Sequence, residues 1–480
     1  NKSEVTDIHH KRLAYDEILA NLLVLSQARK RVKKIKKSKK EFDQFLFNRI
    51  KKNFTFILTS NQKSIIEEIN KDLKSEFRMF RLLQGDVGSG KTIISLLAAS
   101  NVLRSNFQVA FMAPTEILAK QHYNLACKIF KTTNINIELL TGKSSYKEKK
   151  LITKNLLTGK INFLIGTHAL FQKNIIFKRL GLVIIDEQHK FGVKQRIKLA
   201  DKGGKDCDIL LMTATPIPRT LILTVYGDMD ISRLTQKPLN RKEILTLIKP
   251  DNKIDEVILF VKNQIINKNQ IFWICPLIEE SKKLQYEAAV KKYNQLSKLF
   301  PNKVGLIHGA LAKHEKDKVL YKFLNKSFHI LVSTTVIEVG IDLPDVNIIV
   351  IENSNKFGLS QLHQLRGRVG RGNKQGTCLL LYKNNLSDTA KKRLKILKST
   401  NDGFFIADED MKLRGYGDVL GYQQSGIKDF KIADPVHHED LFKIAEQNIK
   451  SIESDEETFY KYTNLLKLFD KAEIINEINI

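Results

Sequence analysis

The sequence predicts an α/β protein in which two parallel-sheet domains follow one another along the chain. Short apolar runs that end in small or polar residues alternate with helical segments, which is typical of strands buried on both faces of a parallel sheet. The runs fall into two series, and a chain of 480 residues with 42% hydrophobic residues can bury two or three cores. The first series is MFRLLQG, FQVAFMAPT, NFLIGTH, LGLVIIDE and DILLMTATP, and the second is QIFWICPL, KVGLIHG, FHILVSTT, VNIIVIEN and GTCLLLY.

Residues 1–50, which precede the first series, are predicted to form a helical linker. Within residues 11–29, apolar side chains recur near helical spacing and predict an amphipathic helix. These side chains are Leu13, Ile18, Leu22, Leu23 and Leu25. Residues 29–40 contain nine basic residues in twelve, which indicates either a solvated surface or a phosphate-contacting one.

The two sheet domains are expected over residues 51–236 and 237–395, and residues 396–480 are expected to form a C-terminal region with helices. The junction near residues 236–243 is a polar stretch that contains Pro238, as is typical of a linker. The chain begins at Asn1 rather than Met, so we expect it to be a fragment or a processed chain.

The charge balance favours a polyanionic partner. Lys and Arg number 80 against 52 Asp and Glu, which gives a formal net charge of +28. The alternative is a general compositional drift toward lysine that carries no function. The four cysteines are too widely spaced for a zinc site, and no apolar run is long enough to cross a membrane. These features fit a reducing, cytoplasmic compartment.

A glycine-rich loop is the strongest single indication of chemistry. GDVGSGKT (85–92) follows an apolar run and precedes a helical segment, and this context lets backbone N–H groups surround phosphates. Lys91 is expected to reach the β and γ phosphates of a nucleotide, and Thr92 to bind Mg²⁺. The predicted nucleotide-binding residues of the loop are Gly85, Asp86, Val87, Gly88, Ser89, Gly90, Lys91 and Thr92.

Two carboxylates end a later apolar run, LGLVIIDE. Asp186 is expected to hold Mg²⁺, and Glu187 to orient and deprotonate the attacking water, because phosphoryl transfer depends mainly on metal and positioning. Upstream, Gln62 is a candidate for reading adenine, with Phe54 or Phe56 stacking on the ring. The alternative is an ordinary helix start capped by Thr59.

Arginines in QLHQLRGRVGRG (361–372) supply a third component of a hydrolytic site. A guanidinium group has a fixed charge that suits the γ-phosphate during transfer. Because these arginines, Arg366, Arg368 and Arg371, lie in the second predicted domain, the site would be complete only when the two domains close.

Several motifs together resemble the superfamily 2 helicases, and more narrowly the bacterial ATP-dependent RecG DNA helicases. The resemblance rests on GDVGSGKT, MAPTEIL, LLTG, GTHALF, DEQHKFGVKQR, MTATPIPRTL, TTVIEVGIDLP, QLHQLRGRVGRG and NDGFFIADEDMKLRGYGD. It covers residues 11–435 and implies two tandem RecA-like domains, a C-terminal helical hairpin and loop, and the use of ATP and Mg²⁺.

The resemblance also implies an activity. Such proteins are double-stranded DNA translocases that migrate Holliday junctions and regress stalled forks in recombination and repair, with an N-terminal wedge domain that this sequence does not contain. Branched or duplex DNA, a monomeric cytoplasmic motor associated with the nucleoid, and contact with a single-stranded-DNA-binding protein are implied as well.

Further site residues are implied by position in the family motifs. Gln188, His189, Thr213 and Thr215 would connect the γ-phosphate to domain closure and DNA, Gly340 and Asp342 would approach the ribose, and Arg368 and Arg371 would act as arginine fingers. The positions implied to contact or translocate DNA also include Thr115, Thr141, Gly142, Thr335, Arg414 and Gln424.

The stretch LRGYGDVLGYQQSG (413–426) departs from the family pattern. Tyr416 replaces a proline, and Tyr422 and Gln423 replace a threonine and an arginine, so a φ restraint and a fixed charge are lost. Our hypothesis is that hydrolysis is normal but is coupled less tightly to DNA movement. The alternative is neutral drift.

Three other functions remain to be distinguished. A transcription-repair coupling factor shares the motor, but its usual carboxylate motif differs from DEQH. A nucleic-acid-binding module with a decayed ATPase would lack DNA-stimulated hydrolysis, and an RNA helicase would be stimulated best by RNA.

Overall fold

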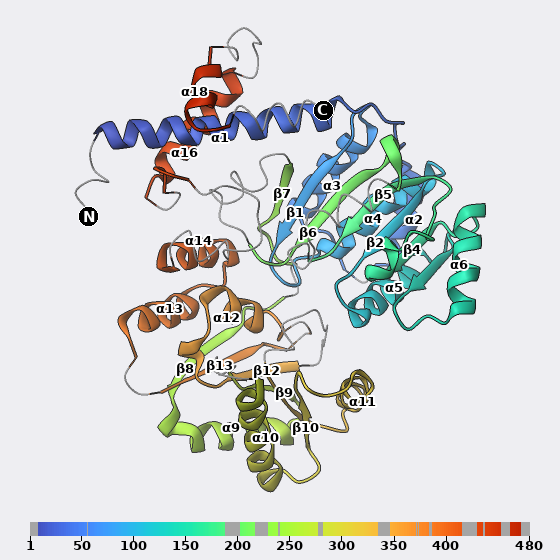
Figure 1. Ribbon diagram of the computed structural model, residues 1–480. Coiled ribbons are helices and arrows are strands. Elements are labelled where there is room, and N and C mark those ends of the chain that lie inside the picture. The colour runs from blue at the N-terminus through green and yellow to red at the C-terminus, as the bar shows by residue number, and fades with distance from the viewer. Residues whose placement is uncertain are drawn as a thin grey trace.

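Two parallel β-sheets form the two halves of the molecule (Figure 1), so the predicted two-sheet α/β fold is confirmed. The computed structural model describes residues 8–54, 56–187, 202–216, 229–238, 241–276, 282–334, 346–370, 372, 374–383, 386–414, 430–434, 437–452 and 461–471. Among these residues no helix is long and apolar enough to span a bilayer. We propose the domain division at residues 236/237, since the last strand of the first sheet ends at Leu234 and the next strand begins at Leu245.

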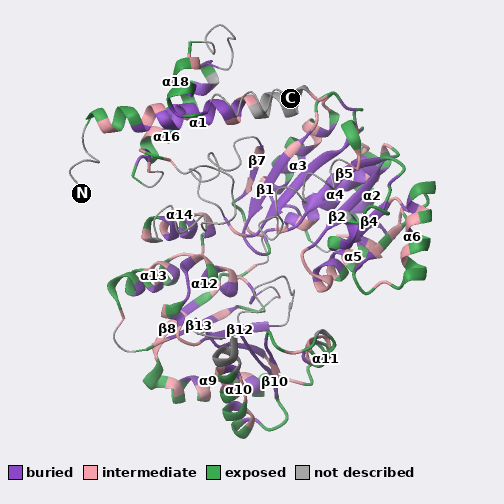
Figure 2. Ribbon diagram, in the orientation of Figure 1, coloured by how far each residue is buried: buried purple, intermediate pink, exposed green. Residues whose placement is uncertain are grey.

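The first sheet has the strand order β3-β4-β2-β5-β6-β1-β7. Its strands are β1 (Phe80–Gly85), β2 (Gln108–Met112), β3 (Ile137–Leu140), β4 (Phe163–Gly166), β5 (Leu180–Ile185), β6 (Asp208–Thr213) and β7 (Asp230–Leu234). The five predicted runs form β1, β2, β4, β5 and β6, which are buried almost throughout (Figure 2). The edge strands β3 and β7 are only partly buried, so they lack a continuous apolar run and the sequence patterns did not predict them.

The second sheet has the order β10-β11-β9-β12-β13-β8, and all its neighbours are parallel. Its strands are β8 (Leu245–Pro250), β9 (Gln270–Ile274), β10 (Val304–Ile307), β11 (Ile330–Ser333), β12 (Val346–Ile351) and β13 (Thr377–Tyr382). All five predicted runs are strands. The additional strand, β8, lies at the sheet edge and again has intermediate burial.

Helices cover both faces of each sheet, because continuous apolar strands must be shielded from water on both sides. Two apolar clusters lie against the first sheet and two against the second. The helices are α2 (Gln44–Lys51), α3 (Ser60–Lys74), α4 (Lys91–Arg104), α5 (Glu116–Phe130), α6 (Tyr146–Thr158), α9 (Ile254–Ile266), α10 (Lys282–Leu299), α11 (Lys313–Leu324), α12 (Leu359–Arg366), α13 (Asp388–Ser399) and α14 (Gly403–Arg414).

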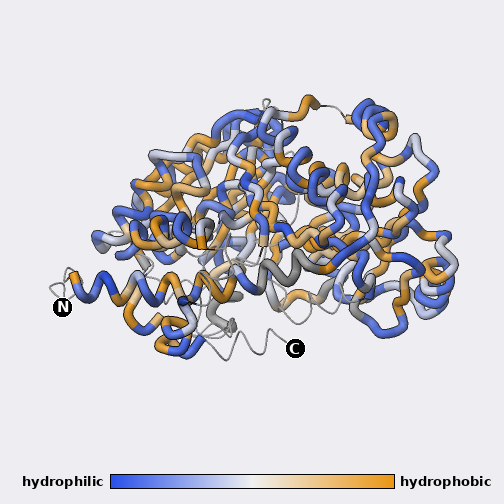
Figure 3. The backbone as a smooth tube through the Cα atoms, turned by 90° about the horizontal axis from the view of Figure 1, so that it is seen from above, coloured by the Kyte–Doolittle hydropathy of each residue, from blue (hydrophilic) through white to orange (hydrophobic). Residues whose placement is uncertain are grey.

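The N-terminal helix packs against the C-terminal helices. α1 (Ile8–Lys34) confirms the predicted amphipathic helix, and it forms a separate apolar cluster with α16 (Glu439–Ile452) and α18 (Thr463–Leu468). Apolar and polar positions alternate along α1 (Figure 3). The buried carboxylate of Glu17 accepts hydrogen bonds from the backbone N–H groups of Lys431, Ile432 and Ala433, at 2.7, 2.8 and 2.8 Å.

Lys37 and Lys40, near the end of the basic run, are neither solvated nor available to phosphate, which corrects both expectations for these two positions, whereas Lys36 and Lys39 are exposed. The ammonium groups of Lys37 and Lys40 are fully buried, and each lies 2.8 Å from Asp208 Oδ2. Backbone hydrogen bonds from Lys37 to Glu76 and from Lys40 to Leu73 align this segment with the first domain. The two lysines therefore fasten the linker to the first sheet domain.

Candidate nucleotide-binding site

The predicted site residues of the first domain gather at the carboxyl edge of its sheet. β5, β6 and β1 are neighbours in the sheet, and they end at Ile185, Thr213 and Gly85. Each strand is followed directly by a predicted functional segment. Parallel strands bring their carboxyl ends to one edge, so residues about 100 positions apart in sequence share one site.

The glycine loop has the backbone that a phosphate cradle needs. Gly88 and Gly90 have φ values of 76° and 99°, a left-handed conformation that favours glycine. A Cβ atom at Gly90 would also lie 2.3 Å from Gln62 Nε2. Gly90 is the residue before α4, so the N-terminus of that helix lies at the loop. Free N–H groups and the helix dipole at such a position favour an anion.

Lys91 lies over this loop, and its ammonium group donates to the carbonyl oxygens of Gly85 and Asp86 at 2.6 and 2.9 Å. The side chain of Ser89 is buried, and its Oγ has no hydrogen-bond partner among the described residues. An unsatisfied hydroxyl beside a buried ammonium group fits a phosphate oxygen, because buried polar groups are normally hydrogen-bonded.

Asp186 is held by a residue that the sequence patterns did not predict. His122 Nε2 on α5 lies 2.8 Å from Asp186 Oδ2, and both side chains are nearly buried. Burial opposes ionisation, but the hydrogen bond from His122, together with the charges of His122 and Lys91, lowers the pKa of Asp186 below its usual value. An ionised, oriented carboxylate is the oxygen donor that Mg²⁺ prefers.

Metal binding through Asp186 and Thr92 would need further ligands from phosphate or water. No group of three His, Cys, Asp or Glu among the described residues could hold a metal ion. Mg²⁺ bound with a nucleotide usually has few protein ligands and keeps several waters.

Glu187 has a strained backbone and a perturbed carboxyl group. Its φ is 50°, and its Oε2 accepts a hydrogen bond from Ala214 N at 3.3 Å. Burial, followed by the charge of Asp186, raises the pKa of Glu187, while the charges of Lys91 and Arg368 oppose that rise. A carboxylate with a raised pKa is a better general base near neutral pH.

Gln62 is engaged within the protein. Its Oε1 accepts from Thr59 N, its backbone N–H donates to Thr59 Oγ1, and its Nε2 donates to Ser89 O at 2.8 Å. The alternative interpretation, a helix start capped by Thr59, is therefore confirmed. Phe54 and Phe56 stack on one another with ring centroids 5.2 Å apart. The adenine contact of Gln62 stays a prediction.

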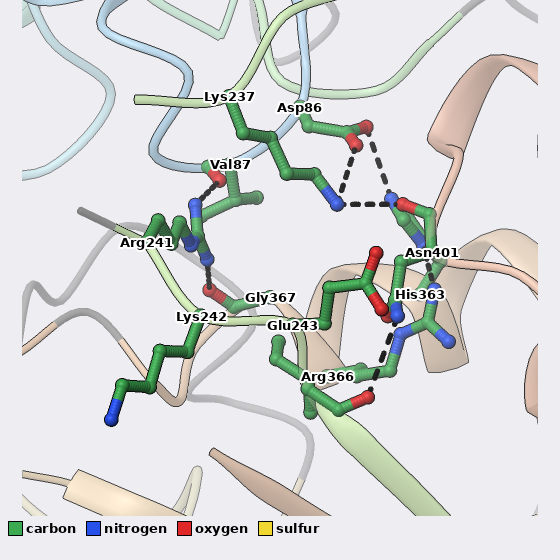
Figure 4. A pocket seen from close by; sticks show the side chains of 11 residues that line it. Asp86, Val87, Lys237, Arg241, Lys242, Glu243, His363, Arg366, Gly367 and Asn401 are labelled. Atoms are coloured by element: carbon green, nitrogen blue, oxygen red, sulfur yellow. Dashed lines mark hydrogen bonds and ion pairs between the residues drawn. The ribbon is translucent and has the colours of Figure 1, made fainter. Parts of the chain in front are cut away.

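Residues of the second domain contact the glycine loop (Figure 4). Arg241 donates to Val87 O and Gly367 O, and His363 Nε2 lies 3.0 Å from Asp86 Oδ1. The Asp86 side chain is thus turned toward the second domain. Arg368 is buried, and its charge acts on Glu187. The expected meeting of the two domains at the nucleotide loop is present in the geometry.

Five predicted DNA-contacting or coupling residues lie at or after the carboxyl ends of strands of the first sheet. Thr115 caps α5 by accepting a hydrogen bond from Leu118 N, and Thr141 and Gly142 follow β3. Thr213 and Thr215 contact each other, with 2.9 Å between their hydroxyl oxygens.

Other predicted residues lie outside the part that the structure describes. These are Gln188, His189, Thr335, Gly340, Asp342, Arg371, Tyr416, Tyr422, Gln423 and Gln424. Arg414 is the last residue of α14, but its side chain is not described. His122, Arg241 and His363 were missed as site residues because their contacts join segments that are distant in sequence.

Two parallel α/β domains that meet at a phosphate loop, with carboxylates on one and arginines on the other, define a two-domain helicase motor. Three family models match in succession: DEAD/DEAH box helicase at residues 59–223, helicase conserved C-terminal domain at 244–373, and ATP-dependent DNA helicase RecG, domain 3, C-terminal, at 400–474. The chain belongs to the RecG family of ATP-dependent DNA helicases.

Curated relatives and one solved structure agree with this placement. The RecG helicase of Aquifex aeolicus is 44% identical over 473 residues, which are 97% of this chain and 60% of that protein. The Bacillus subtilis protein is 43% identical, over 98% of this chain and 69% of that protein. A structure of RecG bound to a three-way DNA junction aligns with a TM-score of 0.75 and 42% identity, over 91% of this chain and 57% of that chain. The chain thus spans roughly 60% of the length of the relatives it matches.

Proposed function

We propose that this chain is the motor of an ATP-dependent double-stranded DNA translocase that remodels branched DNA. One arrangement carries the proposal: Lys91, Asp186 and Glu187 of the first domain gather at one sheet edge, and the charge of Arg368 from the second domain acts on Glu187. A relative of 42% identity is described as bound to a three-way DNA junction. Branch migration and fork regression are the reactions that such a motor would drive.

The residues of the first domain would divide the hydrolytic work. Lys91 would bind the β and γ phosphates, and Thr92 and Asp186 would hold Mg²⁺, which would supply positive charge against the phosphate oxygens. Glu187 would orient a water molecule and accept its proton. The φ of 50° at Glu187 and the hydrogen bond from Ala214 support a fixed carboxyl position.

Arginines of the second domain would complete the group of charges that stabilises the transition state. Arg368, and Arg371 beside it in the motif, would stabilise the charge on the transferred phosphoryl group. Because both arginines belong to the second predicted domain and Lys91 belongs to the first, hydrolysis would require both domains to be in contact. Domain contact during the reaction is what couples hydrolysis to movement along DNA.

DNA would bind across both domains. Thr115, Thr141 and Gly142 lie at the same sheet edge as the nucleotide loop and are proposed to contact the DNA backbone. The net charge of +28 would attract phosphates, and affinity should fall steeply with salt through counterion release. A flat salt response would assign the charge to compositional drift.

The test is ATP hydrolysis by the purified chain with duplex DNA, branched DNA and RNA at equal nucleotide concentration. We expect branched DNA to stimulate most, and Lys91→Ala to abolish hydrolysis while retaining most DNA affinity, because the basic surface remains. The variant Lys262→Ala, on α9 and outside the site, is the control. Stimulation by RNA above DNA, or a hydrolytically active Lys91→Ala protein, would overturn the proposal.

The monomeric state, contact with a single-stranded-DNA-binding protein and nucleoid association remain proposals drawn from the family. Looser coupling through Tyr416, Tyr422 and Gln423 is likewise proposed, and Gln423→Arg should then lower the ATP consumed per base pair unwound.

A further inference from the structure

The carboxylate of Asp86, inside the glycine loop, is bound by groups of the second domain. His363 Nε2 on α12 lies 3.0 Å from Asp86 Oδ1, and Lys237 Nζ lies 3.9 Å from Asp86 Oδ2. Asp86 and His363 are buried. Figure 4 shows these side chains converging in the pocket between the loop and α12. Phosphate binding by such a loop does not require a particular residue at its second position. The contact of Asp86 with the second domain therefore needs another explanation.

The hydrogen-bond direction at His363 is fixed by its second partner. Arg366 Nη2 lies 2.9 Å from His363 Nδ1, and a guanidinium group can only donate. Nδ1 is therefore the acceptor, so Nε2 carries the hydrogen and donates it to Asp86. Burial, the largest influence, lowers the pKa of His363 and favours this neutral form.

Arg366 carries the connection into the C-terminal region. Its Nη1 donates to the carbonyl oxygens of Leu397 and Thr400 at 2.5 and 2.9 Å, where α13 ends. The buried guanidinium thus joins His363 to the turn between α13 and α14. A continuous chain of hydrogen bonds runs from the glycine loop to this helical hairpin.

The start of α14 lies directly against the contact between Asp86 and His363. A Cβ atom added at Gly403 would lie 1.8 Å from Asp86 Oδ1 and 2.6 Å from His363 Nε2. Asp402 caps the helix by accepting from Phe404 N at 2.9 Å. Only a residue without a side chain fits between the helix start and the buried pair.

We propose that His363 is a positioning residue that transmits the position of the phosphate loop to the α13–α14 hairpin. The same residue, Asp86, is held by Lys91 at its carbonyl oxygen and by His363 at its carboxylate. When Lys91 leaves this carbonyl to bind phosphate, Asp86 is released on one side, and the hydrogen-bonded chain passes its shift to the hairpin. This inference rests on the proposed function as a DNA-translocating motor.

The test compares ATP consumed per base pair unwound on branched DNA. His363→Ala should raise this ratio about tenfold, because a hydrogen bond to a charged group is lost. His363→Gln keeps one donor and one acceptor and should recover most of the coupling. His437→Ala is the matched control, since His437 forms an exposed hydrogen bond to Asp434 at 2.9 Å.

A second variant tests the same contact from the helix start. Gly403→Ala should raise the ratio as much as His363→Ala, because the added Cβ atom would lie 1.8 Å from Asp86 Oδ1 and would displace the buried pair. Asp86→Ala combined with His363→Ala should be no worse than either single change, because both remove one link.

The outcomes distinguish the two proposals. A wild-type chain without DNA-stimulated hydrolysis would refute the proposed function. If the wild type is active and His363→Ala, His363→Gln and Gly403→Ala all consume as much ATP per base pair as the wild type, only the role of His363 is overturned. If His363→Ala and His363→Gln raise the ATP consumed per base pair equally and both lower the thermal midpoint, His363 has only a structural role. That result would also overturn the proposed role of His363.

Discussion

His122 on α5 and Asp186 after β5 are joined by a hydrogen bond of 2.8 Å between Nε2 and Oδ2. The His122 ring also lies 4.6 Å from the ring of Phe111, centroid to centroid, which holds the imidazole in place. A buried carboxylate with a fixed neighbour can present its other oxygen to a metal ion in one orientation.

Loss of His122 should weaken metal use. In His122→Ala, we expect the Mg²⁺ concentration for half-maximal ATP hydrolysis to rise by roughly 10- to 100-fold, as for other residues that orient a metal ligand. A Mg²⁺ titration of the hydrolysis rate measures this change. The exposed His314 on α11 provides the control variant His314→Ala. An unchanged Mg²⁺ dependence would show that Asp186 does not need its partner.

The pH dependence of hydrolysis should report Glu187. Glu187 must be ionised to act as the base, and burial and the charge of Asp186 raise its pKa. As the pH is lowered, turnover should therefore begin to fall at a higher pH than an ordinary glutamate would cause. Arg368 opposes this rise. Arg368→Ala should therefore move the acid limb to higher pH besides lowering turnover, and rate profiles between pH 5 and about 9 would measure both.

If the acid limb of Arg368→Ala coincided with that of the wild type, the charge of Arg368 would not reach Glu187. Glu187→Gln should abolish turnover at every pH, because the amide cannot accept the proton.

Removal of Asp208 should destabilise the first domain. Asp208→Ala leaves Lys37 and Lys40 buried without their carboxylate, at a cost of roughly 3–5 kcal/mol in the free energy of unfolding. Asp388→Ala, which removes an exposed partner of Lys391, should change it by about 0.5 kcal/mol or less. Denaturant unfolding measures both.

The same substitution has a predicted pH dependence. Burial lowers the pKa of Lys37, so the folded state releases this proton more readily than the unfolded chain. The unfolded state then binds more protons between the two pKa values, and the stability of Asp208→Ala should rise as pH increases through that window. If Asp208→Ala lowers the free energy of unfolding equally at pH 7 and at about pH 10, the buried lysine charges are not the cause of the destabilisation.

Glu17→Gln should loosen the chain that follows the glycine-rich stretch 413–426. The carboxylate accepts three backbone hydrogen bonds, whereas glutamine has one acceptor oxygen and turns an amide group toward the remaining donors. Amide hydrogen exchange of Lys431, Ile432 and Ala433 should accelerate, with exchange in α4 unchanged. Glu67→Gln, at an exposed position of α3, is the control, and equal exchange in both variants would remove the assigned role of Glu17.

The two sheets and the chemical core of the site were predictable from the sequence. Strands such as β5 and β9 are buried along their entire length, so their continuous apolar runs are visible without a structure. The glycine loop and Asp186 with Glu187 were likewise predictable, because their function requires particular residues in short, local patterns.

Which residues from distant segments meet depends on how the chain packs in three dimensions. His122 with Asp186, and His363 with Asp86, are separated by 64 and 277 positions, and no local pattern shows that the members of each pair meet. The local sequence predicted solvent or phosphate around Lys37 and Lys40, but folding places Asp208 beside both. Sequence patterns reveal what a segment must bury or bind, but hydrogen bonds and ion pairs depend on side-chain distances that only packing sets.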